Sequence, residues 1–90
     1  MLIALICTDK TGALETRKEN RDAHLAYIAD TGVVTMAGPL LDTAGEMAGS
    51  LLILDVEDAA AAESWAANDP YAKAGLFSDV RIQPWKKVIG

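Results

Sequence analysis

The sequence has little of the chemistry that disulfides and metal sites need. Its 90 residues include one cysteine and one histidine, so an intrachain disulfide is excluded and the two side chains cannot form a closed zinc site by themselves. The carboxylates do not follow the spacing of a calcium-binding loop. We therefore expect no metal and no other cofactor. Cys7 lies in an apolar run, where a small buried hydrophobe is the simpler interpretation and a reactive thiol the alternative.

Positive charge is also scarce. The chain has 8 Lys and Arg residues against 13 Asp and Glu residues, which gives a formal net charge of −5, and a protein of this charge repels phosphate backbones. The one local basic cluster, Lys86 and Lys87, is too short for a nucleic-acid footprint. We therefore expect no nucleic-acid partner.

Long hydrophobic runs are absent as well. The apolar opening at residues 2–7 has no basic segment before it and is followed at once by Asp9 and Lys10. It is too short for a signal peptide or a membrane span. The sequence therefore predicts a cytoplasmic protein without a membrane partner.

The periodicity of the apolar residues predicts an alternation of strands and helices within one domain spanning residues 1–90. Continuous apolar runs are typical of strands buried on both faces, and apolar residues at helical spacing indicate helices. Gly32 is placed to cap the first helix, and Asp69-Pro70 is a favoured helix start. The predicted elements are a strand at 2–8, a helix at 14–30, a strand at 33–37, a loop at 40–49, a strand at 50–56, a helix from 57 or 58 to about 68, a short turn or helix at 70–75 and a strand at 77–87.

This β-α-β-β-α-β order predicts a ferredoxin-like α+β domain with an antiparallel sheet. In that topology the first and third strands lie in the centre, which suits the two most apolar runs, and Pro84 lies in an edge strand. Both helices pack on one face, whereas the central strands are apolar on both faces. We therefore expect a second copy of the chain to cover the other face, as a homodimer.

The first predicted helix carries polar residues next to its apolar face. At 100° per residue Arg21 falls in the middle of that face, with Arg17 and His24 on its flank. This spacing predicts that Arg21 is buried against an anion and that the three side chains line a pocket for a small molecule. The alternative is that the arginines extend along the helix to solvent and that His24 is an ordinary boundary histidine. The apolar residues of the face are Leu14, Leu25 and Ile28.

Several short motifs together resemble the YciI (YCII-related) family across essentially the whole chain. The segment 41–48 is shorter than in many relatives, so no contact is transferred from it. The motifs are Arg21-x-x-His24-Leu25, Ala37-Gly38-Pro39-Leu40, Gly49-Ser50, Asp69-Pro70-Tyr71 with Ala74-Gly75, and Pro84-Trp85-Lys86-Lys87.

The resemblance implies a dimeric α/β-barrel protein with a His-Asp pair in a pocket, here His24 and Asp69. From the residues alone the favoured interpretation of Asp69 is a helix cap, because Asp followed by Pro at a helix start needs no further function. The family is similar in architecture to small dimeric isomerases, lyases and monooxygenases that act on aromatic breakdown products, and some members resemble dehydrochlorinases. The resemblance predicts that His24 and Asp69 lie within hydrogen-bond reach, about 2.6–3.2 Å between heavy atoms, either directly or through one water.

The leading hypothesis is a cofactor-free lyase or isomerase. His24 moves a proton because histidine titrates near neutral pH, Asp69 orients and charges the imidazole, and Arg21 or Arg17 holds an anionic oxygen of the substrate. Which of His24 and Asp69 is the base stays open, and two further residues, Ser50 and Tyr71, are candidates for the same pocket. The alternatives are a non-catalytic module that binds a small acid, and a dimeric scaffold whose pocket is filled by side chains.

Overall fold

The computed structural model describes residues 1–90 and has the element order that the sequence predicts. The elements are β1 (Leu2–Asp9), α1 (Leu14–Thr31), β2 (Val34–Leu41), β3 (Met47–Asp55), α2 (Ala59–Asn68), α3 (Pro70–Lys73) and β4 (Phe77–Pro84). The predicted helix ends are present: the backbone of Gly32 adopts a left-handed conformation after α1, and the Asp58 side chain accepts a hydrogen bond from the Ala61 amide at the start of α2.

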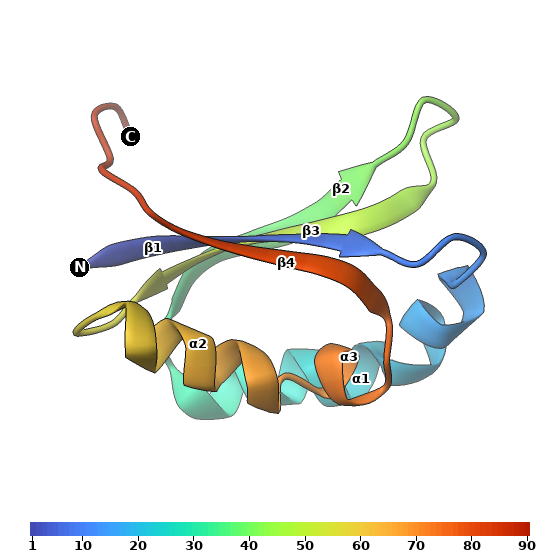
Figure 1. Cartoon of the computed structure of the whole chain (residues 1–90), viewed down its shortest axis with the longest axis horizontal. Helices are drawn as coiled ribbons and strands as arrows, with labels where there is room; N and C mark the ends of the chain where they lie inside the picture. Colours follow the sequence, from blue (N-terminus) through green and yellow to red (C-terminus); the bar gives the residue numbers. More distant parts are fainter.

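The four strands form one antiparallel sheet in the order β2-β3-β1-β4. The predicted fold class is therefore confirmed, with the two most apolar strands in the centre. Figure 1 shows all three helices on one face of the sheet. The structure contains no helix with the length and hydropathy of a membrane span.

The segment 40–49, which the sequence predicts to be a loop, is strand at both of its ends and loop only in its middle. β2 continues to Leu41 and β3 begins at Met47, so only five residues join them. Two devices close this turn: Asp42 accepts hydrogen bonds from backbone amides within it, and Gly45 adopts a φ of +83°. β2 tolerates Pro39 because it is an edge strand. The predicted loop was too long because polar and small residues hid the strand pattern at both of its ends. β4 ends at Pro84 rather than at residue 87.

The core lies between the sheet and the helices. Leucine side chains of the two central strands pack against Trp65 of α2. The indole nitrogen of Trp65 donates to the Thr31 hydroxyl, and the Tyr27 hydroxyl donates to the Trp65 carbonyl. These bonds join the last turns of α1 to α2, and the buried polar residues Arg17 and His24 come before them in α1.

The opposite face of the sheet has no helix over it. It exposes large apolar side chains, including Met36, Leu40 and Leu51. In Figure 1 the C-terminal segment and the β2–β3 turn both rise on this side of the sheet, away from the helices. We call this uncovered surface the open face.

Candidate functional site

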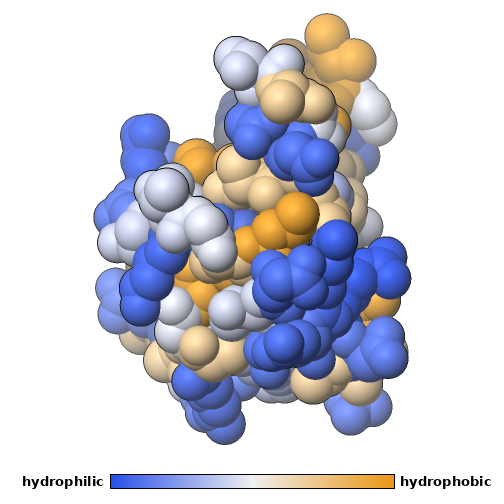
Figure 2. All heavy atoms as spheres, turned by 90° about the vertical axis from the view of Figure 1, so that its right-hand side faces the viewer, coloured by the Kyte–Doolittle hydropathy of each residue, from blue (hydrophilic) through white to orange (hydrophobic).

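A cavity of about 190 Å³ lies between α1 and the strands β2 and β3, on the helix-covered side of the sheet. Its size is comparable to the roughly 150 Å³ cavity that accepts a benzene ring in an engineered protein. Figure 2 shows this end of the molecule, where hydrophobic side chains in the middle are surrounded by hydrophilic ones. The lining residues are Arg17, Arg21, His24, Leu25, Ile28, Ala37, Gly38, Pro39, Met47, Ser50, Leu52 and Tyr71.

His24 and Asp69 form a buried pair beside this cavity. The distance from Nδ1 of His24 to Oδ1 of Asp69 is 2.7 Å, and their side chains are only 7% and 3% exposed. The predicted contact is confirmed. The helix-cap interpretation of Asp69 holds as well, because the same oxygen accepts a hydrogen bond of 3.0 Å from the backbone N–H of Tyr71 at the start of α3.

The geometry of the pair determines which nitrogen of the histidine is available. An ionised carboxylate only accepts hydrogen bonds, so Nδ1 of His24 carries the proton that it donates to Asp69. Nε2 of His24 makes no hydrogen bond within the protein. Every side-chain nitrogen or oxygen that is fully shielded from solvent has a hydrogen-bond partner, so Nε2 is not fully shielded. Nε2 is therefore open to the cavity that His24 lines. A neutral imidazole in this tautomer presents a basic nitrogen to any molecule bound there.

Arg17, not Arg21, is the buried arginine. Arg21 is exposed at the edge of the cavity, so the prediction that it is buried was wrong. It forms no ion pair with a carboxylate of the protein. Arg17 and His24 are seven residues apart, which is about two helical turns and places both on the inward face of α1. Leu25, which suggested a different core-facing side of α1, is 44% exposed.

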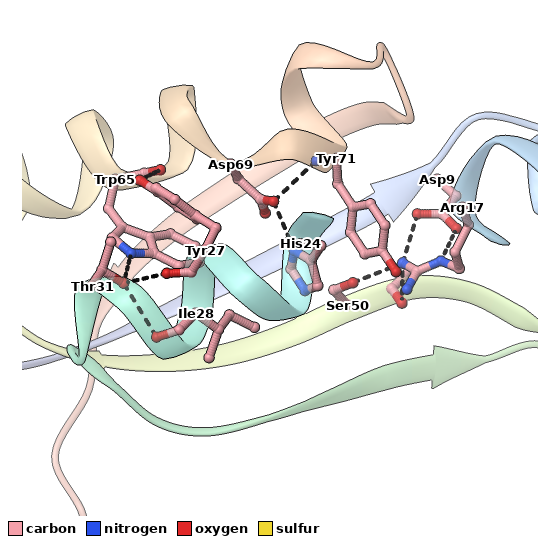
Figure 3. Close-up of polar contacts among 11 residues, drawn as sticks. Asp9, Arg17, His24, Tyr27, Ile28, Thr31, Ser50, Trp65, Asp69 and Tyr71 are labelled. Atoms are coloured by element: carbon pink, nitrogen blue, oxygen red, sulfur yellow. Dashed lines mark hydrogen bonds and ion pairs between the residues drawn. The ribbon is translucent and has the colours of Figure 1, made fainter. Parts of the chain in front are cut away.

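Arg17 is held by contacts from two strands (Figure 3). It donates to both carboxylate oxygens of Asp9, at 2.8 and 3.0 Å, and its Nη2 also donates to the Gly49 carbonyl and the Ser50 hydroxyl, both at 2.7 Å. Burial lowers the pKa of Arg17, but the hydrogen bonds and the charge of Asp9 outweigh burial and raise it overall. The guanidinium is therefore permanently charged.

The remaining nitrogen of this guanidinium is directed differently. Nη1 of Arg17 makes none of the hydrogen bonds to Asp9, Gly49 and Ser50, and Arg17 lines the cavity, so Nη1 is the nitrogen that remains to donate to a bound molecule. Ser50 lines the same cavity and, since its oxygen accepts from Arg17, retains its own O–H donor. The predicted substrate-binding residues Arg17 and Ser50 thus lie at one end of the cavity.

Tyr71 lies between these two groups. Its ring stacks on the imidazole of His24, with centroids 3.9 Å apart and planes inclined by 12°, and the guanidinium carbon of Arg17 is 4.8 Å from the centroid of the same ring. Burial raises the pKa of the Tyr71 hydroxyl, against the opposing effect of the nearby arginines. Tyr71 therefore stays a neutral phenol at physiological pH.

The sequence analysis gave neither Asp9 nor Gly49 a role in the site, although Gly49 belongs to one of the family motifs. Asp9 ends an otherwise apolar strand, and a carboxylate at that position is the only signal in the sequence of a buried partner. Gly49 is required by the close approach of β1 and β3, because a Cβ there would collide with the carbonyl oxygen of Cys7. Groups of three or more His, Cys, Asp or Glu side chains at metal-binding distance do not occur.

Comparison with known proteins places this chain in a family. The model of the YCII-related domain matches residues 1–86. The protein YciI of Escherichia coli O6:H1 is 38% identical over 98% of this chain and 99% of its own length. An uncharacterised protein of Haemophilus influenzae is 34% identical over the same shares of both chains.

A solved structure extends the comparison. The 5-chloro-2-hydroxyhydroquinone dehydrochlorinase TftG of Burkholderia phenoliruptrix, in complex with 2,5-dihydroxybenzoquinone, matches with a TM-score of 0.88 and 35% identity over 96% of this chain and 94% of that one. An antibiotic biosynthesis monooxygenase, at 12% identity over 99% and 100% of the chains and a TM-score of 0.61, shares the fold alone. The resemblance read from the sequence motifs is thus confirmed, and the chain belongs to the YCII-related family.

Proposed function

We propose that this protein is a cofactor-free enzyme that moves a proton on a small, hydroxylated and anionic ring compound, with elimination of hydrogen chloride as the leading reaction. The observation that carries the proposal is the buried contact of 2.7 Å between His24 and Asp69, which leaves Nε2 of the histidine on the cavity. A paired imidazole of this kind is a recurrent arrangement for general acid–base catalysis.

Each polar group of the cavity has a role in this mechanism. His24 is the base through Nε2, and Asp69 holds its tautomer and stabilises the imidazolium that forms. Arg17 donates from Nη1 to an anionic oxygen of the substrate, with Ser50 as a second donor beside it. Arg21, at the edge of the cavity, adds a positive charge that favours the entry of anions.

The chemistry of the relative TftG suits such a site. In a chlorinated trihydroxybenzene, a base removes one hydroxyl proton and the ring carbon that bears chlorine gains a proton. Chloride then leaves with the electron pair of the C–Cl bond and a second hydroxyl proton is lost, which gives a hydroxybenzoquinone and one equivalent of HCl. The ring is oxidised and its C–Cl carbon reduced within one molecule, so no outside oxidant or reductant is needed.

The proposed assembly is a homodimer joined through the open face. Exposed Met36, Leu40 and Leu51 lie together on strands β2 and β3, and large apolar patches of this kind are typical of interaction sites. β2 also supplies cavity-lining residues. Packing of a second sheet on the open face would therefore make the cavity wall more rigid.

The test is chloride release from 5-chloro-2-hydroxyhydroquinone, followed with a chloride electrode under anaerobic conditions. We expect the wild-type protein to accelerate release over buffer, and His24→Gln to lose about 10²- to 10⁴-fold of that rate. Lys18→Gln is the matched control, since Lys18 lies on the same helix, is exposed and does not line the cavity. Binding without chloride release, or a His24→Gln variant as active as the wild type, would overturn the proposal.

A further inference from the structure

The imidazole of His24 has a second neighbour besides Asp69. The ring of Tyr71 lies almost parallel to it, with 3.9 Å between centroids and 12° between planes. Tyr71 is among the largest fully buried side chains, with an exposed fraction of 2%. Figure 3 shows the two rings side by side between α1 and the segment that begins α3.

The hydrogen bond to Asp69 cannot by itself fix the direction of the histidine. A contact between Nδ1 and one carboxylate oxygen locates that nitrogen, but the imidazole can still rotate about the line that joins the two atoms. The χ2 torsion of histidine has broad minima and resists this rotation weakly. A flat ring packed on the face of the imidazole removes the remaining freedom, because tilting would bring the two rings into collision.

Tyr71 is itself held from several directions. Its backbone N–H donates to Oδ1 of Asp69, and the guanidinium carbon of Arg17 is 4.8 Å from the centroid of its ring. The edge of Phe77 meets the ring at 89°, with 6.1 Å between centroids. A side chain held in this way moves little, so it can restrict the movement of the ring that it contacts.

The carboxylate and the stacking ring come from one short segment. Asp69 and Tyr71 are separated only by Pro70, whose ring fixes its own φ at the first position of α3. Oδ1 of Asp69 accepts hydrogen bonds from both His24 and the Tyr71 amide. The segment Asp69-Pro70-Tyr71 therefore presents an in-plane acceptor and a stacking surface to the same imidazole.

We infer that Tyr71 is a positioning residue, whose ring holds the imidazole of His24 in the plane that directs Nε2 into the cavity. This inference rests on the proposed function, because directing Nε2 is useful for proton transfer. It assigns the role to the ring and not to the hydroxyl. A shift of about 1 Å in a catalytic group can reduce a rate by about 100-fold, so the loss of the ring is expected to lower kcat more than it raises KM.

Two substitutions separate the ring from its hydroxyl. Tyr71→Phe keeps the stacking surface, and we expect kcat for 5-chloro-2-hydroxyhydroquinone within about twofold of the wild type. Tyr71→Met removes the surface, and we expect kcat to fall about 10- to 100-fold with KM within about threefold. The control is Tyr27→Met, which removes an aromatic ring that packs on Trp65 and not on His24. It should leave kcat unchanged.

A second measurement does not depend on turnover. His24 is the only histidine, so its ring C–H groups give isolated NMR signals, and their ¹³C relaxation reports how freely the imidazole moves. We expect a rigid imidazole in the wild type, Tyr71→Phe and Tyr27→Met, and a mobile one in Tyr71→Met. If the wild type releases no chloride, the proposed function fails while the relaxation measurement still decides the role of Tyr71.

Specific results would overturn the inference. They are an equally rigid imidazole and an unchanged kcat in Tyr71→Met, or an equal loss of kcat in Tyr71→Phe and Tyr71→Met. Should Tyr71→Met not fold, as judged by circular dichroism, the relaxation of the wild-type imidazole is decisive. A wild-type imidazole that is already mobile is not held by the stack, and the inference is then wrong.

Discussion

The two faces of the sheet are built from the same strands but differ in what covers them. Leu52 of β3 points toward the helices and is completely buried, whereas its neighbour Leu51 points to the open face and is 39% exposed. The helix-covered face also holds two buried polar pairs, Arg17 with Asp9 and His24 with Asp69. The open face has exposed apolar groups instead.

The buried charged and polar groups therefore lie on the helix-covered face of the sheet. Buried charges are costly unless they are paired and hydrogen-bonded, and the contacts that satisfy them are all supplied within this chain. The apolar groups of the open face need only an apolar partner. The helix-covered face is therefore suited to a small-molecule site, and the open face is suited to association with another apolar protein surface.

The largest effect on stability is expected from breaking the ion pair of the helix-covered face. Arg17→Met leaves the carboxylate of Asp9, which is 6% exposed, without its cation, and we expect a loss of about 3–5 kcal/mol in the free energy of unfolding. Urea titration measures it. Adding Asp9→Leu should restore part of the loss, and no recovery in the double variant would indicate that the pair is not the cause.

The next effect compares the neighbours Leu52 and Leu51. Leu52→Ala creates a cavity in the core and should cost about 2–5 kcal/mol at every protein concentration. Leu51→Ala should weaken the proposed dimer, so that its loss of stability grows as the protein is diluted. Urea titration at two concentrations, with sedimentation velocity, tests both. A wild type that is monomeric at micromolar concentration would contradict the expectation for Leu51.

A smaller effect concerns alkaline pH. Burial, with help from nearby carboxylates, raises the pKa of Cys7 from 9.0 to about 12. The folded state therefore retains a proton that the unfolded state loses, so stability is fully present below pH 9 and falls as the pH rises from 9 toward 12. Cys7→Ala should reduce the slope by up to about 1.4 kcal/mol per pH unit. Unfolding titrations of both proteins between pH 8 and 11 measure the difference, and parallel curves would contradict it.

The smallest effect is expected at the exposed edge of the cavity. Arg21→Gln should leave stability within about 0.5 kcal/mol and weaken binding of the anion 2,5-dihydroxybenzoquinone by no more than about fivefold, since exposed charge interactions contribute up to about 1 kcal/mol. Calorimetry at low and high salt measures the loss, which should shrink at high salt. Lys18→Gln should bind as the wild type does. A larger loss that salt does not affect would mean that Arg21 contacts the ligand directly.

Part of the site was predictable from local patterns. The spacing of Arg17 and His24 placed both on one side of a helix, and the family motifs linked His24 to Asp69. Arg21 was misplaced because Leu25, which is exposed beside the cavity, was counted as core. A hydrophobic residue at the edge of a cavity and one in the core have the same helical spacing, so periodicity could not separate them.

The sequence by itself determined the order of the elements, the central position of the two apolar strands and the family, because these follow from local periodicity and from motifs. Only the tertiary structure decided that Asp9 meets Arg17 and that Tyr71 stacks on His24. Those contacts join residues from different elements. They depend on how α1 and α3 are placed over the sheet, which local spacing does not record.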